Sequence, residues 1–259
     1  MKLSTLPFLF AALLIFMAAI TRRAVRLHYL RPKSAKIVYK LLVALTLWTI
    51  ASSILAIQGF YASANFYALL PGLWMPFIPV ILCTIPFVIS SHFRETLEKI
   101  INCTPLHWFV YLQALRIAAL GTLYKTLTGH FPIYLEIAIG IPDLIFGFSA
   151  LYIAKRVTSN TIGWKGLAIW NLIGAGIIII PGEILIQMGL PGVLQVFSTP
   201  PTAAVLFEFP LVIAPTVVVP LLVVMNGLVA WWLFKTRSVS FSNKKATTVF
   251  LDFPVMKRK

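Results

Sequence analysis

The sequence predicts an all-α membrane protein, folded as a bundle of about seven transmembrane helices. Apolar residues make up 59% of the 259-residue chain and charged residues only 11%, about half the charged share of a soluble globular domain. The apolar residues are gathered into seven runs, each close to the ~20 residues that cross a hydrocarbon core. The lysines and arginines gather in alternate segments between these runs. Together these observations favour a single transmembrane domain over residues 1–237.

Each apolar run is expected to form one membrane-spanning helix. The expected spans are residues 3–21, 38–60, 68–91, 104–124, 131–154, 162–186 and 211–234. The first run could instead be a cleaved signal peptide. However, its positive charges follow the apolar stretch rather than precede it, and no A-x-A site is present, so we expect an uncleaved anchor.

Two segments longer than the other loops fall outside the expected spans. Residues 187–210 are interrupted by glycine and proline, so we expect a loop with a short interfacial or re-entrant piece. Residues 238–259 mix Ser, Thr and Lys with scattered Phe. We expect them to form a basic cytoplasmic tail.

The positive charges predict the orientation. Of the 22 lysines and arginines, only Lys2, Arg116 and Lys125 lie outside the first, third and fifth loops and the tail. The positive-inside rule therefore places the N-terminus outside and the C-terminus in the cytoplasm, which requires an odd number of spans. The predicted location is a cell membrane of the cytoplasmic, or inner, type.

The net charge of +15 could suggest a nucleic-acid partner. Because the cations are spread over loops between apolar runs, we expect no nucleic acid. The expected partners are the lipid bilayer, anionic lipid headgroups on the cytoplasmic side and, as a possibility, another membrane protein.

Charged residues inside the runs are the best candidates for a functional site. Arg116 lies in the fourth run, and Glu136 and Asp143 lie in the fifth. Ionised groups at bilayer depth cost several kcal/mol unless they face a partner or a wet cavity. The short link between the two runs makes them antiparallel neighbours, so Arg116 can reach either carboxylate. Asn171 of the sixth run could extend this polar cluster.

The polar cluster has two interpretations that the sequence leaves open. In the first, an Arg–carboxylate pair clamps two helices together in a non-catalytic membrane protein. In the second, the same charges serve a small-solute or proton-linked transporter, because a buried acid suits a proton-coupled step.

The chain contains none of the motifs that we sought from known membrane enzymes and cofactor-binding proteins. The last run has no lysine for a retinal Schiff base, and no P-loop or H-E-x-x-H motif is present. Cys83 and Cys103 lack C-x-x-C spacing, and the four histidines lie in loops or near span ends. We therefore predict that the protein is not an enzyme, with no catalytic residue, no cofactor and no metal site.

One spacing pattern surrounds the charged residues. From Arg116 to Ala150 the chain reads R-x4-G…G-x2-P…G-x2-D-x3-G-x2-A, followed by Trp170 and Asn171. This spacing resembles a family of uncharacterised bacterial polytopic integral membrane proteins, over roughly a quarter of the chain. The resemblance implies a polytopic membrane fold and brings no known activity. Pro142 stands where that pattern has a second glycine.

Overall fold

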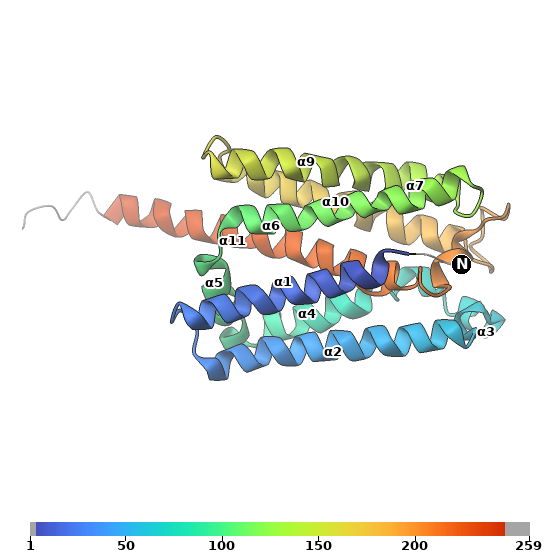
Figure 1. Cartoon of the computed structure of the whole chain (residues 1–259), viewed down its shortest axis with the longest axis horizontal. Coiled ribbons are helices and arrows are strands. Elements are labelled where there is room, and N and C mark those ends of the chain that lie inside the picture. Colours follow the sequence, from blue (N-terminus) through green and yellow to red (C-terminus); the bar gives the residue numbers. More distant parts are fainter. Residues whose placement is uncertain (1–3, 247–259) are drawn as a thin grey trace, which may run out of the picture.

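The helices of the protein run side by side in an elongated bundle (Figure 1). The computed structural model describes residues 4–246, and within this range the chain is helical, without a strand. The helices are α1 (Leu6–Arg26), α2 (Pro32–Ile57), η1 (Phe60–Ala62), α3 (Ala64–Ala68), η2 (Pro71–Leu73), α4 (Phe77–Ile89), α5 (Ser91–Cys103), α6 (Leu106–Leu112), η3 (Gln113–Ala119), α7 (Leu120–Leu127), α8 (Ile133–Leu135), η4 (Glu136–Gly140), α9 (Ile141–Thr158), α10 (Trp164–Met188), η5 (Ala203–Phe207), η6 (Ala214–Val218) and α11 (Val219–Ala246). The expected all-helical class is confirmed.

Six helical segments in the described part of the chain are long and apolar enough to cross a membrane. They are Leu6–Arg26, Pro32–Ile57, Pro71–Ile89, Ile133–Thr158, Trp164–Met188 and Ala214–Thr236. The seventh expected run, residues 104–124, is not among them. It folds as three consecutive helical pieces, α6, η3 and α7. Six of the seven expected spans therefore have a counterpart of sufficient length and hydropathy.

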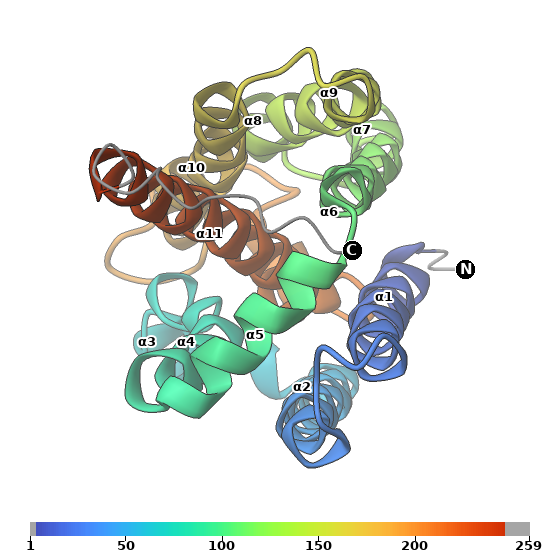
Figure 2. The same ribbon diagram turned by 90° about the vertical axis from the view of Figure 1, so that its left-hand side faces the viewer.

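The last helix lies at the centre of the bundle. Half of the most apolar window of Ala214–Thr236 (50%) is buried, against 17% for Pro32–Ile57. Viewed along the bundle, α11 passes between α10 and the pair formed by α4 and α5, with α1 and α2 further out (Figure 2). A helix that is apolar on all sides suits such a central position, because other helices cover much of its surface.

A proline in the last helix exposes a backbone carbonyl that a distant tryptophan satisfies. Pro220 has no N–H to donate to the carbonyl of Thr216, one turn earlier. The indole Nε1 of Trp48, on α2, donates to that oxygen at 3.0 Å. The kink-prone start of the last helix is thereby tied to α2.

The third loop, between Ile89 and Thr104, forms the amphipathic helix α5 instead of an irregular connection. The hydroxyl of Ser90 caps its first turn by accepting from the backbone N–H of Phe93 at 3.2 Å. Phe93, Leu97 and Ile100 form its buried face. The helix lies across one end of the bundle (Figure 2). The sequence analysis treated α5 as a loop because the stretch is too polar to span a membrane, although its charges recur at helical spacing.

Side chains from two other helices, α1 and α11, hold α5 in place. The indole of Trp232 donates to the side-chain oxygen of Asn102 at 2.9 Å. The Nε of Arg23 donates to the carbonyl of Cys103 at 3.2 Å. Lys235 forms an ion pair with Glu98. The apolar face of α5 therefore packs on the core, and polar groups at its side and C-terminal end bind α1 and α11.

At the opposite end, α10 continues to Met188 and an irregular connection with η5 leads on to η6. This agrees with the loop expected there. A Cβ built at Gly72 would lie 2.8 Å from the backbone nitrogen of Gln187, so the turn at η2 packs directly against the end of α10. The Gln187 side chain also accepts from the Gly72 N–H at 3.0 Å. Of the expected tail, residues 238–246 extend α11 and residues 247–259 lie outside the described part.

Candidate functional site

Two antiparallel helical stretches hold the expected polar cluster. The first runs through α6, η3 and α7, and the second through α8, η4 and α9. Each leaves regular α-helical geometry where a charge lies: η3, which contains Arg116, is a 3-10 helix, and η4, which begins at Glu136, is a π-helix. Such departures inside a longer helix are uncommon and often mark functional positions.

Gly147 allows the two stretches to approach closely. A Cβ at this position would lie 2.8 Å from the backbone nitrogen of Ile117 and 3.0 Å from the carbonyl carbon of Arg116. Ala150 and Ala154 follow on the same face of α9 and are fully buried at 0% exposure. Small residues at this spacing are typical of close helix contacts in membranes.

The guanidinium group of Arg116 lies at this contact and is enclosed by protein. Its Nη1 donates to Oδ1 of Asp143 at 2.7 Å, and its Nε donates to Oε1 of Gln113 at 3.0 Å. The guanidinium carbon, Cζ, lies 4.8 Å from the ring centre of Phe146. The Arg116 side chain is 0% exposed and that of Asp143 is 13% exposed. Of the two acids within expected reach, the arginine therefore pairs with Asp143.

An aromatic stack connects this pair to the next helix. The ring of Phe146 lies against Trp170 of α10, with ring centroids 4.4 Å apart and planes 16° from parallel. The Trp170 indole donates to the hydroxyl of Ser149 at 3.0 Å, and that hydroxyl donates to the carbonyl of Phe146 at 2.7 Å. The arginine is thus one member of a layer that joins three helices.

Glu136 faces the same antiparallel neighbour but lies beyond the arginine. Its carboxyl group lies beside the hydroxyls of Thr122 and Thr126 on α7. The Thr122 hydroxyl donates to the carbonyl of Ala119 in η3, and the Thr126 hydroxyl donates to the carbonyl of Thr122. Among the described residues, neither Glu136 oxygen has a partner within hydrogen-bond geometry. The carboxyl group fills the space where a Cβ of Gly140 would be. Glu136 is therefore a buried acid separate from the Arg116–Asp143 pair.

The expected extension through Asn171 is not found. Its amide donates to the carbonyl of Leu167 in its own helix at 2.9 Å. Asn226 of α11 lies closer to the site, since its Nδ2 and the edge of the Phe146 ring both border Gly174. Asn226 is 0% exposed, and within the described residues neither its nitrogen nor its oxygen has a hydrogen-bond partner.

Sequence reasoning missed the neutral members of the layer. Gln113 precedes Arg116 by three residues, and Phe146 follows Asp143 by three. Residues three apart lie on one face of a helix, so this spacing was a usable signal once the charged pair had been placed. Trp170 carried no such signal, because its contact depends on how α9 and α10 pack.

This fold and this site define the class: an all-helical protein with six helical segments of membrane-spanning length in its described residues. An arginine–aspartate pair is buried between one of these segments, Ile133–Thr158, and the stretch formed by α6, η3 and α7. The chain belongs to the DUF8737 family, a domain of unknown function, whose model matches residues 75–234. The match includes every residue of the polar cluster and confirms the expectation of an uncharacterised family. No curated protein and no solved structure matches the chain.

Proposed function

We propose that the protein is a non-catalytic multi-pass protein of the cytoplasmic (inner) membrane, in which the Arg116–Asp143 pair clamps η3 to α9. The observation that carries this proposal is the enclosure of the guanidinium group. Two of its three nitrogens donate to side-chain oxygens, and Phe146 lies against the group. A charge held in this way is fixed by its surroundings and has little freedom to exchange partners.

The apolar surface of the bundle supports a membrane location. Leu47 is 62% exposed, Ile145 63% and Ile169 55%, each on a different long helix. Large apolar surfaces of this kind are rare on soluble monomers. Hydrocarbon would cover them at no cost, since lipid chains are as apolar as the side chains.

Seven spans follow if α6, η3 and α7 together count as one crossing. They form one continuous helical stretch from Leu106 to Leu127, which lies along the bundle beside α1 (Figure 1). The start of α1 and the end of α11 then lie on opposite sides of the membrane. The loop cations gather at the end where α5 lies, so we assign that end to the cytoplasm.

The clamp has a physical purpose in this setting. Within lipid, no hydrophobic effect draws one helix to another. Separating Arg116 from Asp143 would leave two charges at bilayer depth, each costing several kcal/mol. The pair therefore raises the free energy needed to separate the two stretches above what their packing alone would require.

A double-mutant cycle tests the clamp. Arg116→Met and Asp143→Leu each leave one buried charge alone, and each is expected to lower the free energy of unfolding by about 3 kcal/mol or more. The double variant is expected to lose far less than the sum, because no lone charge remains. Unfolding of the full chain in mixed detergent micelles measures all four states. Additive losses would contradict the clamp.

A second candidate function rests on a specific observation. Nη2 of Arg116, both oxygens of Glu136 and the amide of Asn226 are buried without hydrogen-bond partners in the described part of the chain. Such groups usually bind water or a solute. A small-solute or proton-linked transporter would use the same charges.

Proton flux separates the two functions. The full chain in sealed proteoliposomes, with a pH-sensitive dye inside, reports any proton movement driven by a pH gradient. Transport predicts flux that Glu136→Gln or Asp143→Asn abolishes in protein that remains folded. The clamp predicts no flux above that of empty vesicles. It also predicts a measurable loss of stability in Asp143→Asn and none in Glu136→Gln.

A further inference from the structure

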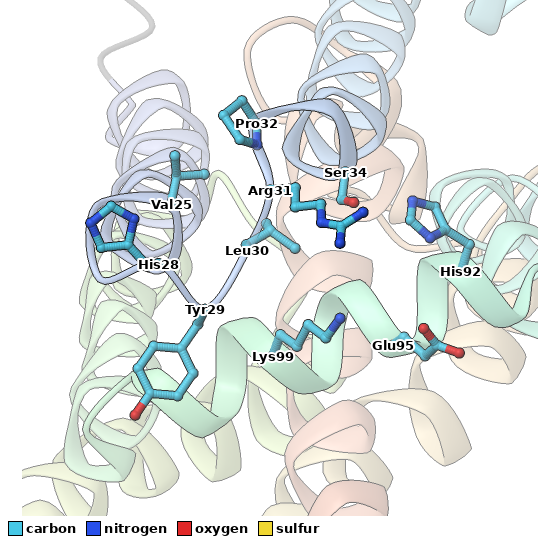
Figure 3. A pocket seen from close by; sticks show the side chains of 10 residues that line it. All are labelled: Val25, His28, Tyr29, Leu30, Arg31, Pro32, Ser34, His92, Glu95 and Lys99. Atoms are coloured by element: carbon cyan, nitrogen blue, oxygen red, sulfur yellow. The ribbon is translucent and has the colours of Figure 1, made fainter.

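A pocket of about 650 Å³ lies at the cation-rich end of the bundle. The turn between α1 and α2 forms one wall, and one face of α5 forms the other (Figure 3). Four of its lining residues carry basic side chains and one carries an acid: His28, Arg31, His92, Lys99 and Glu95. The side chains of Arg31 and Lys99 point toward each other across the opening (Figure 3).

Arg31 and Lys99, the two cations of this pocket, have no anionic partner within residues 4–246. Among the described residues no ion pair joins Arg31 or Lys99 to an acid, although Glu95 precedes Lys99 by one helical turn. Two positive charges that face one space repel each other. An anion between them would turn that repulsion into attraction.

The backbone adds to the positive potential. The pocket includes the first turn of α2, a helix of 26 residues with no acidic residue in its first turn and no side-chain cap. The N-terminus of a helix carries a partial positive charge. The hydroxyl of Ser34, in the same turn, lines the pocket as a further hydrogen-bond donor.

The surroundings place the pocket at headgroup depth. Its second wall, α5, is an amphipathic helix that lies across the end of the bundle (Figure 2), as an interfacial helix does. Four tryptophans lie near this end: Trp108 at the start of α6, Trp164 at the start of α10, and Trp231 and Trp232 toward the end of the apolar part of α11. Tryptophan is enriched at the membrane–water interface.

We infer that this pocket binds a phosphate group, and that the source is the headgroup of an anionic phospholipid. Arg31 and Lys99 hold the phosphate oxygens, with Ser34 as an additional donor. Glu95 accepts a hydrogen bond from a headgroup hydroxyl, which favours a glycerol-type headgroup over a choline one. The inference uses the membrane location proposed above but does not depend on the clamp, because the pocket shares no residue with it.

Binding to the full chain in neutral detergent tests the inference. The probes are short-chain phosphatidylglycerol, short-chain phosphatidylcholine and inorganic phosphate, titrated by calorimetry. The pocket variant is Arg31→Gln with Lys99→Gln. The matched control is Lys36→Gln with Lys40→Gln, which removes the same charge from exposed positions of α2 outside the pocket.

We expect phosphatidylglycerol to bind the unaltered chain and the control with affinities within about twofold. The pocket variant is expected to lose about tenfold or more, since each cation near a headgroup contributes several-fold. Phosphatidylcholine is expected to bind at least about tenfold more weakly than phosphatidylglycerol.

Comparable binding of inorganic phosphate would confirm the phosphate site and overturn the lipid as its source. Equal losses in the pocket and control variants would overturn the site itself, because diffuse surface charge would then account for binding. Absence of binding by both phosphatidylglycerol and inorganic phosphate would also overturn the site. Because the pocket shares no residue with the Arg116–Asp143 pair, these results do not depend on the outcome of the double-mutant cycle.

Discussion

At the scale of the residue, Gly147 controls whether Arg116 and Asp143 can meet. A Cβ there would lie 2.8 Å from the backbone nitrogen of Ile117, and backbone cannot move aside as a side chain can. Gly147→Ala is therefore expected to lower the free energy of unfolding by about 1–3 kcal/mol through overpacking. The measurement is unfolding in mixed detergent micelles.

Gly121 provides the matched control for that substitution. It lies in α7, and a Cβ built there would meet no heavy atom within 4 Å. Gly121→Ala is expected to leave stability unchanged or raise it by up to about 1 kcal/mol, because alanine favours the helix. Equal effects of the two alanines would show that close approach at Gly147 is not required.

Tyr61, at the opposite end from α5, provides a pH-dependent signal. It is 3% exposed, and its hydroxyl donates to that of Ser52 at 3.2 Å. Burial raises its pKa above the ordinary value of 10.0, and the Ser52 hydrogen bond offsets part of the rise. The unfolded chain therefore ionises first as the pH rises, and the contribution of this tyrosine is intact below about pH 10 and lost above it.

The expected result is a steeper loss of stability above about pH 10 in the unaltered protein than in Tyr61→Phe. Chemical unfolding of both proteins at a series of alkaline pH values measures the two slopes. Tyr67, whose pKa is also raised by burial and then by the carboxylate of Glu208, remains in both proteins. Identical slopes would show that the Tyr61 hydroxyl is not desolvated.

At the scale of the element, Arg94 joins α4 to α5. Its Nη1 donates to the carbonyls of Phe87 at 2.9 Å and Val88 at 2.6 Å, which belong to the last turn of α4 and have no partner within that helix. Arg94→Ala is expected to cost about 1–3 kcal/mol, the range for hydrogen bonds from a charged donor. Only Ser90 separates α4 from α5. Loss of the Arg94 hydrogen bonds should therefore loosen this connection, and the backbone amides of α5 should exchange hydrogen faster in Arg94→Ala.

Glu95→Ala is the control for Arg94→Ala. It alters the neighbouring exposed position of the same helix, and surface changes of this kind usually stay within about 0.5 kcal/mol. Hydrogen exchange followed by mass spectrometry resolves α5 from its neighbours. Unchanged exchange in Arg94→Ala would mean that the buried face of α5 holds it without the cap.

The elements differed in how far their sequences predicted them. Long apolar runs such as residues 162–186 became helices close to the expected bounds, because length and hydropathy are local properties. The run at 104–124 also became helical, but the 3-10 geometry of η3 has no local signature and accompanies its contact with Gly147. The helix α5 was missed because we looked for spans, and an amphipathic helix with this many charges does not register as one.

At the scale of the whole molecule, chain connectivity predicted the pairing of Arg116 but packing chose the partner. The short link before Phe131 predicted antiparallel neighbours, which left two acids within reach. The choice of Asp143 over Glu136 depends on the relative rotation of the two stretches, which the π-helical turn η4 alters. Asn226 joined the site because α11 is central, and no local pattern in the sequence shows which helix will be central.

The number of crossings is decided by the stretch of α6, η3 and α7. If it crosses the membrane, the positions before and after it lie on opposite sides, and the chain has seven spans. Glu95 and His130 are exposed positions on either side of this stretch. Cys83 and Cys103 are buried free thiols, so both are first replaced by alanine to leave no background label.

Single cysteines at these positions, Glu95→Cys and His130→Cys, are then labelled with a membrane-impermeant maleimide in intact and in permeabilised cells. We expect His130→Cys to react in intact cells and Glu95→Cys only after permeabilisation, because the cations around α5 stay on the cytoplasmic side. The reverse pattern would keep seven spans but invert the orientation. Reaction of both in intact cells, or of neither, would mean that the stretch holding Arg116 does not cross. In that case the guanidinium group would not lie at bilayer depth, and the energetic argument for the clamp would fail with it.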